Sequence, residues 1–217
     1  MAVCAIRSES DLDAAVDGGA DAVGVLVGTT HLAEDSVPLD DARALLLRVP
    51  PYVSRYVVTH LSGTEDLLGL VGALPVDALQ LHDETEPSVL DAVRAGAPSV
   101  RLIKALPVTG TAPGWGRFAA TADAILLDSV DVASGRIGGT GRVHDWRLSA
   151  QVAADCPRPV VLAGGLTPEN VAEAVRAVRP WAVNVNSGVE VEGAKDRRRV
   201  ASFVRAARSW PGGEIGA

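Results

Sequence analysis

Several features are scarce or missing in this 217-residue sequence, and each absence excludes a class of protein. Aromatic residues make up only 4% of the chain, so Val, Leu, Ile and Ala have to build the core, as in a buried parallel sheet. No apolar run reaches the length of a membrane span, and the chain does not open with a basic segment followed by an apolar stretch. We therefore expect a cytoplasmic protein with no membrane partner.

Cysteine and positive charge are also scarce. Cys4 and Cys156 lie far apart without the spacing of a metal site, which excludes a disulfide framework and fits a reducing compartment. The formal net charge of −7 argues against a nucleic-acid partner, because such a partner favours a basic stripe. One basic cluster exists, Lys195 with the arginines at 197–199, and we interpret it as a solvated helix face.

Short aliphatic segments alternate with amphipathic ones along the chain, and this alternation predicts the fold. Each expected strand is rich in Val, Ile or Leu and bounded by Gly, Pro, Asp or Ser: 3–6, 22–27, 54–59, 78–81, 100–104, 124–127, 160–163 and 182–186. About eight helices are expected between them. Eight near-equal repeats, with no GxGxxG turn after the first strand, favour a (β/α)8 TIM barrel over an open doubly wound sheet. We expect a single domain over residues 1–217.

Glycine-rich turns follow three of the expected strands and indicate a phosphate site. Gly164-Gly165 stands before Thr167, Pro168 and an early acid, which is how a capped helix begins. Asn186-Ser187-Gly188 ends the last strand. Amides in such turns and at helix N-termini bind anions, and the loops after strands seven and eight commonly bind phosphate in a barrel. Gly139 and Gly141 belong to a third segment, which we interpret as a loop that closes over a ligand.

The order of these motifs resembles the phosphoribosylanthranilate isomerase family, a (β/α)8 barrel family of tryptophan biosynthesis. The similarity covers nearly the whole chain and includes Gln80-Leu81-His82, Leu126-Leu127-Asp128-Ser129, Gly138-Gly139-Thr140-Gly141, Leu162–Asn170 and Ser187-Gly188-Val189-Glu190. The resemblance implies a cofactor-free Amadori rearrangement of N-(5-phosphoribosyl)anthranilate or a related phosphorylated sugar amine.

The resemblance also assigns roles to single residues. Cys4, near the end of strand one, matches the family's base, and Asp128, at the end of strand six, matches its acid. The expected substrate and phosphate ligands are Gly139, Gly141, Gly164, Gly165, Asn186, Ser187, Gly188 and His82. The expected partner is therefore a phosphorylated small molecule.

Three segments depart from the family's pattern. Strand one reads Ala2-Val3-Cys4-Ala5 where the family has Lys-Ile-Cys-Gly, so a cation that could tune the thiol is missing. The loop over residues 28–35 lacks the arginine with which the family holds the anthranilate carboxylate, and it carries acids instead. Near the last strand, Asn184 and Asn186 stand where the family has Asp and Ser.

Two alternatives stay open beside the isomerase. His31, His60 and His82 fall in or after neighbouring strands, and three imidazoles could hold Zn or another divalent metal. A divergent paralogue could use such a metal on another phosphorylated metabolite, whereas the isomerase interpretation needs no metal. The other alternative is a non-catalytic barrel that binds a phosphometabolite. We expect a monomer or homodimer.

Overall fold

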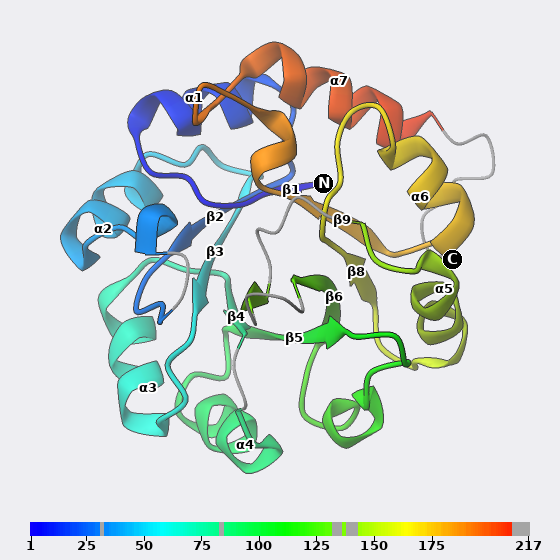
Figure 1. Ribbon diagram of the computed structural model, residues 1–217. Helices are drawn as coiled ribbons and strands as arrows, with labels where there is room; N and C mark the ends of the chain where they lie inside the picture. The colour runs from blue at the N-terminus through cyan, green and yellow to red at the C-terminus, as the bar shows by residue number, and fades with distance from the viewer. Residues whose placement is uncertain (31–32, 83–84, 132–135, 138–142, 210–217) are drawn as a thin grey trace.

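The computed structural model describes residues 1–217 except 31–32, 83–84, 132–135, 138–142 and 210–217. Its centre is a barrel of eight parallel strands: β1 (Ala2–Val3), β2 (Ala22–Leu26), β3 (Ser54–Thr59), β4 (Ala78–Leu81), β5 (Arg101–Val108), β6 (Ala124–Asp131), β8 (Val160–Leu162) and β9 (Ala182–Val185) (Figure 1). The barrel is closed, because β1 pairs with both β2 and β9, and β5 pairs with β6. The predicted (β/α)8 class is confirmed.

Every expected strand is present, and no boundary differs from the prediction by more than four residues. β1 ends at Val3 rather than at residue 6, and the chain turns at Ala5, whose φ of 58° lies in the left-handed region. β5 and β6 run four residues further than expected. They pair with each other as far as Val108 and Ser129, and the last two residues of β6 pair with the short strand β7 (Arg136–Ile137).

Seven α-helices surround the barrel in the described part of the chain: α1 (Glu9–Asp17), α2 (Leu39–Leu47), α3 (Thr64–Ala73), α4 (Pro87–Gly96), α5 (Trp146–Asp155), α6 (Val171–Val178) and α7 (Arg197–Arg208). Between β5 and β6, where an eighth helix was expected, there is only a 3-10 helix, Trp115–Phe118. Residues 109–121 contain three glycines and a proline, which are the poorest helix formers. Among the described helices, none is both long and apolar enough to cross a membrane.

The core is aliphatic, as the composition requires. Alternate residues of each strand point outward, so Val57 of β3 and Leu79 of β4 pack in the layer between the barrel and the helices. Leu26, Tyr56 and Val58 belong to a separate, smaller cluster inside the barrel. The interior cluster lies beside the site, whereas the outer layer stabilises the fold.

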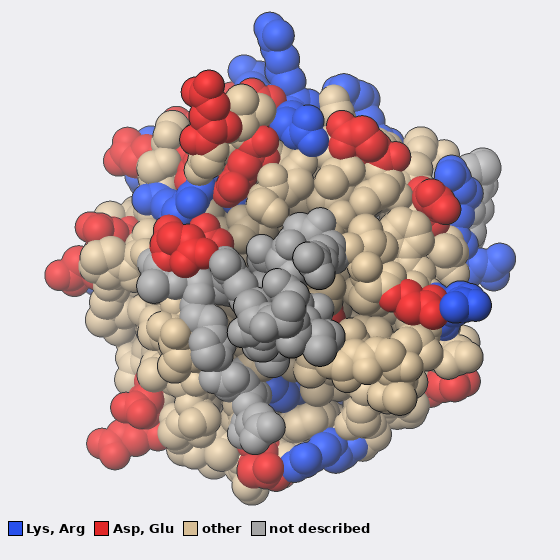
Figure 2. All heavy atoms as spheres, viewed as in Figure 1, with Lys and Arg blue, Asp and Glu red and all other residues tan. Residues whose placement is uncertain are grey.

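Charged side chains of both signs lie around the rim of the face in Figure 2, over the outer helices. Lys195 does not join them. It belongs to β11 (Ala194–Lys195), which pairs with β10 (Glu190–Val191), and its side chain is 0% exposed. The interpretation of the basic cluster as a solvated helix face is therefore wrong for Lys195, although Arg197 and Arg198 are exposed on α7.

Candidate active site

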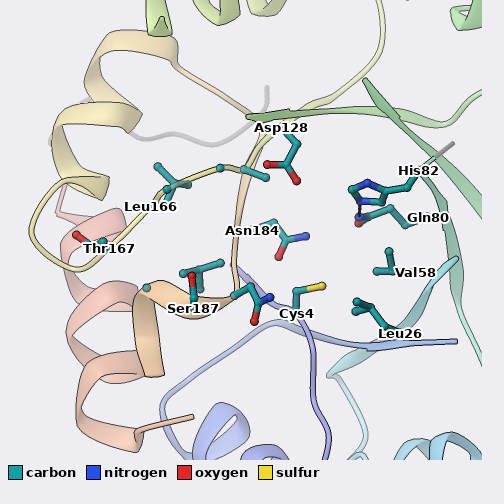
Figure 3. A pocket seen from close by; sticks show the side chains of 16 residues that line it. Cys4, Leu26, Val58, Gln80, His82, Asp128, Leu166, Thr167, Asn184 and Ser187 are labelled. Carbon is teal, nitrogen blue, oxygen red and sulfur yellow. Dashed lines mark hydrogen bonds between the residues drawn. The ribbon is translucent and has the colours of Figure 1, made fainter. Parts of the chain in front are cut away.

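A cavity at the carboxyl ends of the strands brings the predicted site residues together. Those that line it are Cys4, His82, Asp128, Gly164, Gly165, Asn186, Ser187 and Gly188. Cys4 and Asp128 lie on opposite sides of this cavity, with the Asn184 side chain between them (Figure 3). The predicted ligands Gly139 and Gly141 lie outside the described residues.

Cys4 follows β1, and its backbone amide donates to the carbonyl of Val185 at 2.8 Å. Burial raises the pKa of the thiol to about 11, against the opposing effects of the positive charge of Lys195 and a hydrogen bond with Tyr56. A thiol with this pKa is mostly neutral at pH 7, and its thiolate is a minor fraction. Deprotonation of this thiol depends on the groups around it.

Asp128 lies on β6 and is 7% exposed. Its Oδ1 accepts a hydrogen bond from the amide of Ser129 at 2.7 Å. Burial raises the pKa of this carboxyl group to about 6, and the Ser129 amide offsets only part of that rise. A carboxyl group with such a pKa keeps a protonated fraction near neutral pH, as a general acid requires.

The turns after β8 and β9 touch each other backbone to backbone. Gly164 and Gly165 have φ values of 83° and 63°, which favour glycine. A Cβ on Gly188 would lie 1.9 Å from the carbonyl oxygen of Leu166, so only glycine fits there. The amides of Gly165, Ser187 and Gly188 have no acceptor within the described part of the chain. Both turns line the cavity, so these amides can bind an anion there.

The helix after the Gly164-Gly165 turn begins later than expected. The Thr167 amide donates to Asn170 Oδ1 at 2.8 Å, and the Glu169 amide donates to Thr167 Oγ1 at 3.2 Å. These bonds close a turn, and α6 starts only at Val171, with Asn170 as its N-cap. α6 therefore begins at Val171 rather than near Thr167, although Thr167 caps the preceding turn, where its hydroxyl accepts from the Glu169 amide and its carbonyl from the Val171 amide.

Five polar side chains form a closed ring around Asn186, here called the Asn186 ring. Lys195 Nζ donates to Asn186 Oδ1 at 2.6 Å and to Glu190 Oε1 at 2.7 Å. Asn186 Nδ2 donates to Asp35 Oδ2 at 3.0 Å. Arg7 closes the ring, since its guanidinium lies 3.1 Å from Asp35 Oδ1 and 2.9 Å from Glu190 Oε1. The oxygen and the nitrogen of the Asn186 side-chain amide are thus both hydrogen-bonded.

The opposite wall carries Gln80 and His82, whose Nε2 atoms lie 2.7 Å apart. Burial, helped by the nearby charges of His60 and Lys104, lowers the pKa of His82 to about 3, so its ring is neutral. Its buried Nδ1 has no hydrogen-bond partner among the described residues.

The histidine metal site stays a prediction. The rings of His60 and His82 are neighbours, with centroids 5.8 Å apart, and Thr30 donates its amide to His60 Nδ1 at 2.9 Å. The described residues contain no group of three His, Cys, Asp or Glu side chains that could hold a metal ion. His31, the third histidine of that prediction, lies outside them.

Sequence reasoning missed Asn184, Tyr56 and Lys195 as parts of the site. Asn184 could have been found, because it stands two residues before Asn186 and therefore faces the same side of the last strand. Tyr56 and Lys195 carry no such local signal.

Comparisons with known proteins converge on one family. A family model described as N-(5'phosphoribosyl)anthranilate (PRA) isomerase matches residues 1–206. The chain belongs to this family. A relative from Methanosarcina mazei, named N-(5'-phosphoribosyl)anthranilate isomerase 2, is 38% identical over 212 residues, which cover 95% of this chain and 93% of the relative. The resemblance drawn from the sequence motifs is confirmed.

Solved structures of phosphoribosylanthranilate isomerases have the same barrel. The one from Thermotoga maritima is 32% identical, with a TM-score of 0.81 over 96% of this chain and 98% of that chain. A second, 31% identical with a TM-score of 0.78 and the same coverage, is in complex with reduced 1-(o-carboxyphenylamino)-1-deoxyribulose 5-phosphate.

Proposed function

We propose that this protein catalyses the Amadori rearrangement of N-(5'-phosphoribosyl)anthranilate, with Asp128 as general acid and Cys4 as general base. The observation that carries the proposal is the position of these two side chains on opposite sides of one cavity, beside two turns with amides able to bind phosphate. Membership of the isomerase family supports it, as does the substrate-like compound bound to a relative.

Asp128 acts first. It donates its proton to the furanose ring oxygen, the bond from that oxygen to C1 breaks, and the anthranilate nitrogen takes up the positive charge as an iminium. A pKa of about 6 allows the protonated fraction that this step uses.

Cys4 then removes the proton from C2 as a thiolate. The electron pair of that C–H bond forms the C1–C2 double bond and neutralises the iminium nitrogen. When C1 takes up a proton and the C2 hydroxyl loses one, the product is the 1-amino-2-ketose. C2 is oxidised and C1 reduced within one molecule, so the reaction balances without a redox cofactor.

The cavity offers distinct walls to the two ends of such a substrate. We assign the phosphate to the amides of Gly165, Ser187 and Gly188, with the Asn186 ring holding the second turn in place. Leu26 and Val58 give the opposite wall an apolar surface for an aromatic ring. This division supports a phosphorylated aromatic amine as substrate.

The test is the loss of fluorescence of freshly prepared phosphoribosylanthranilate, measured for the wild type, Cys4→Ser and Asp128→Asn, each with and without a chelator. Cys156→Ser is the matched control, since Cys156 is the other cysteine, follows α5 and is not among the residues that line the cavity. We expect wild-type turnover that the chelator leaves unchanged, about 10²–10⁴-fold lower in the two site variants and retained in Cys156→Ser.

Other outcomes would point to the alternatives. Turnover that a chelator abolishes would favour a metal-assisted paralogue. A folded wild type without turnover would contradict the proposed substrate, and binding of phosphate alone would then favour a non-catalytic barrel.

A further inference from the structure

A tyrosine inside the barrel lies close to two residues that line the cavity, Cys4 and Asn184. Tyr56 lies on β3, is 4% exposed, and belongs to the interior cluster against which Cys4 packs. Its hydroxyl donates to Asn184 Oδ1 at 3.3 Å. Asn184 in turn lines the cavity between Cys4 and Asp128 (Figure 3). The tyrosine hydroxyl is thus buried beneath the proposed reaction centre.

The space for this ring comes from a glycine on the neighbouring strand. Gly24 of β2 is the direct cross-strand partner of Tyr56. A Cβ on Gly24 would lie 2.3 Å from two ring carbons and 2.8 Å from the hydroxyl oxygen of Tyr56. The pairing register and the missing side chain together fix where the hydroxyl lies.

Cys4 packs against the cluster that contains Tyr56, and the Tyr56 hydroxyl lowers the pKa of the Cys4 thiol, while burial together with Cys4 raises the pKa of Tyr56 well above its ordinary value. The tyrosine therefore stays protonated and keeps one proton to donate. Beside a neutral thiol, that proton is best used on Asn184. Beside a thiolate, the sulfur is the stronger acceptor, because hydrogen bonds to charged groups are stronger than those to neutral ones.

We propose that Tyr56 is a positioning residue whose hydroxyl turns from Asn184 to the Cys4 sulfur when the thiol loses its proton, and so stabilises the thiolate. The inference rests on the proposed role of Cys4 as base. It also gives the site a substitute for the lysine that the family carries two residues before the cysteine, where this chain has Ala2.

Other ionisable groups also face Cys4. Lys195 favours its thiolate and Asp35 disfavours it through space, and Asp128 and His82 line the same cavity. The test must therefore remove the Tyr56 hydroxyl and leave these charges unchanged.

The experiment measures alkylation of Cys4 by iodoacetamide as a function of pH, in a Cys156→Ser background so that one thiol reacts. Tyr56→Phe removes only the hydroxyl, and Tyr52→Phe is the matched control, because Tyr52 is the other tyrosine of the chain and is fully exposed. We expect alkylation at fixed pH to slow about tenfold in Tyr56→Phe, with the titration of Cys4 moved up by about one pH unit. In Tyr52→Phe the alkylation rate should stay within about twofold of the rate in the protein with both tyrosines.

A second variant keeps the ring and the hydroxyl. In Tyr52→Phe protein Tyr56 is the sole tyrosine, so biosynthetic replacement by 3-fluorotyrosine changes residue 56 alone, where it adds one fluorine to the ring beside the hydroxyl. Its greater acidity should strengthen the hydrogen bond to the thiolate and speed alkylation. Equal alkylation rates in Tyr56→Phe and Tyr52→Phe, or no acceleration by the fluorotyrosine, would overturn the inference.

Alkylation needs no substrate, so this inference and the proposed function can fail separately. A slowed Tyr56→Phe together with a wild type that does not isomerise phosphoribosylanthranilate would refute only the function. Cys4-dependent isomerisation with unchanged alkylation in Tyr56→Phe would refute only the role of Tyr56.

Discussion

The two halves of the barrel mouth differ in how completely their polar side chains are hydrogen-bonded. One half, to which the proposed function assigns the phosphate and which we call the phosphate half, comprises the turns after β8 and β9 and the Asn186 ring. Every side chain of that ring has a partner within the protein. In the opposite half, at the ends of β2 to β4, Thr29 Oγ1, His82 Nδ1 and Thr85 Oγ1 are buried without a partner among the described residues.

This difference indicates which half is ready before the ligand arrives. A closed ring holds its members in one geometry, so an anion binds there with little rearrangement. A buried polar atom without a partner costs free energy, and a ligand that hydrogen-bonds it recovers that cost. We therefore expect the phosphate half to supply affinity and the opposite half to supply selectivity for the rest of the substrate.

The largest expected effect on phosphate binding is in the phosphate half and follows from Gly188→Ala. The new Cβ would lie 1.9 Å from the Leu166 carbonyl oxygen, so the two turns have to separate. We expect a loss of about 3 kcal/mol or more in unfolding free energy and at least about tenfold weaker binding of inorganic phosphate, by denaturant titration and calorimetry. Gly69→Ala, on α3 with nothing within 4 Å of the new Cβ, is the control and should be neutral or slightly stabilising. Unchanged phosphate binding in Gly188→Ala would contradict the assignment of phosphate to these two turns.

Lys195→Met should open the Asn186 ring. Without the ammonium group, Glu190 keeps only Arg7 and the Asn186 amide oxygen loses its donor. Breaking a buried ion pair costs about 3–5 kcal/mol, and we expect KM for the substrate to rise more than kcat falls. The control is Arg198→Met on exposed α7, expected within about 0.5 kcal/mol of the wild type. An equal loss of stability in both variants would show that Lys195 has no special position.

Asp128→Asn should stabilise the protein while it removes the acid. The pKa of Asp128 is about 6 in the folded state and near 3.8 unfolded, so its ionisation above pH 6 opposes folding. The gain at pH 7 should be about 3 kcal/mol, should shrink as the pH falls, and should lie below about 1 kcal/mol at pH 4. Urea titrations across that range measure it. A gain that does not depend on pH would mean that the charge is not its cause.

The smallest expected effect concerns two threonines at the ends of β2 to β4, the half in which polar side chains are less completely hydrogen-bonded. Thr29→Val removes a hydroxyl oxygen that is buried and has no partner in the described part of the chain, and it should raise the unfolding free energy by about 0.5–1 kcal/mol. Thr59→Val removes one that accepts from the Leu61 amide at 3.1 Å, and it should lower the unfolding free energy by about 1–2 kcal/mol. Thermal unfolding distinguishes the two signs, and a loss of stability in Thr29→Val would mean that its hydroxyl is bonded after all.

The sequence predicts the barrel well because its signal is local: each strand is a short aliphatic segment between turn residues. It predicts Cys4, Asp128 and the glycine turns because the family's motifs mark them. Lys195 could not be placed, since composition groups it with the arginines of α7, whereas a β-hairpin turns its side chain into the ring. Tyr56 depends on its pairing with Gly24, a register that the sequence does not reveal. A single domain, a monomer or homodimer and a cytoplasmic location stay predictions.

The pairing of β1 with β9 has a consequence for how the protein matures during synthesis. The strand that ends beside Cys4 keeps one unpaired edge until residues 182–185 have emerged from the ribosome. The Asn186 ring is later still, because Arg7 and Asp35 await residues 186–195. Contacts between such distant segments form slowly, and unpaired edges expose a nascent chain to misassembly. The residue proposed as base therefore obtains its full surroundings only after residues 182–195 have been translated.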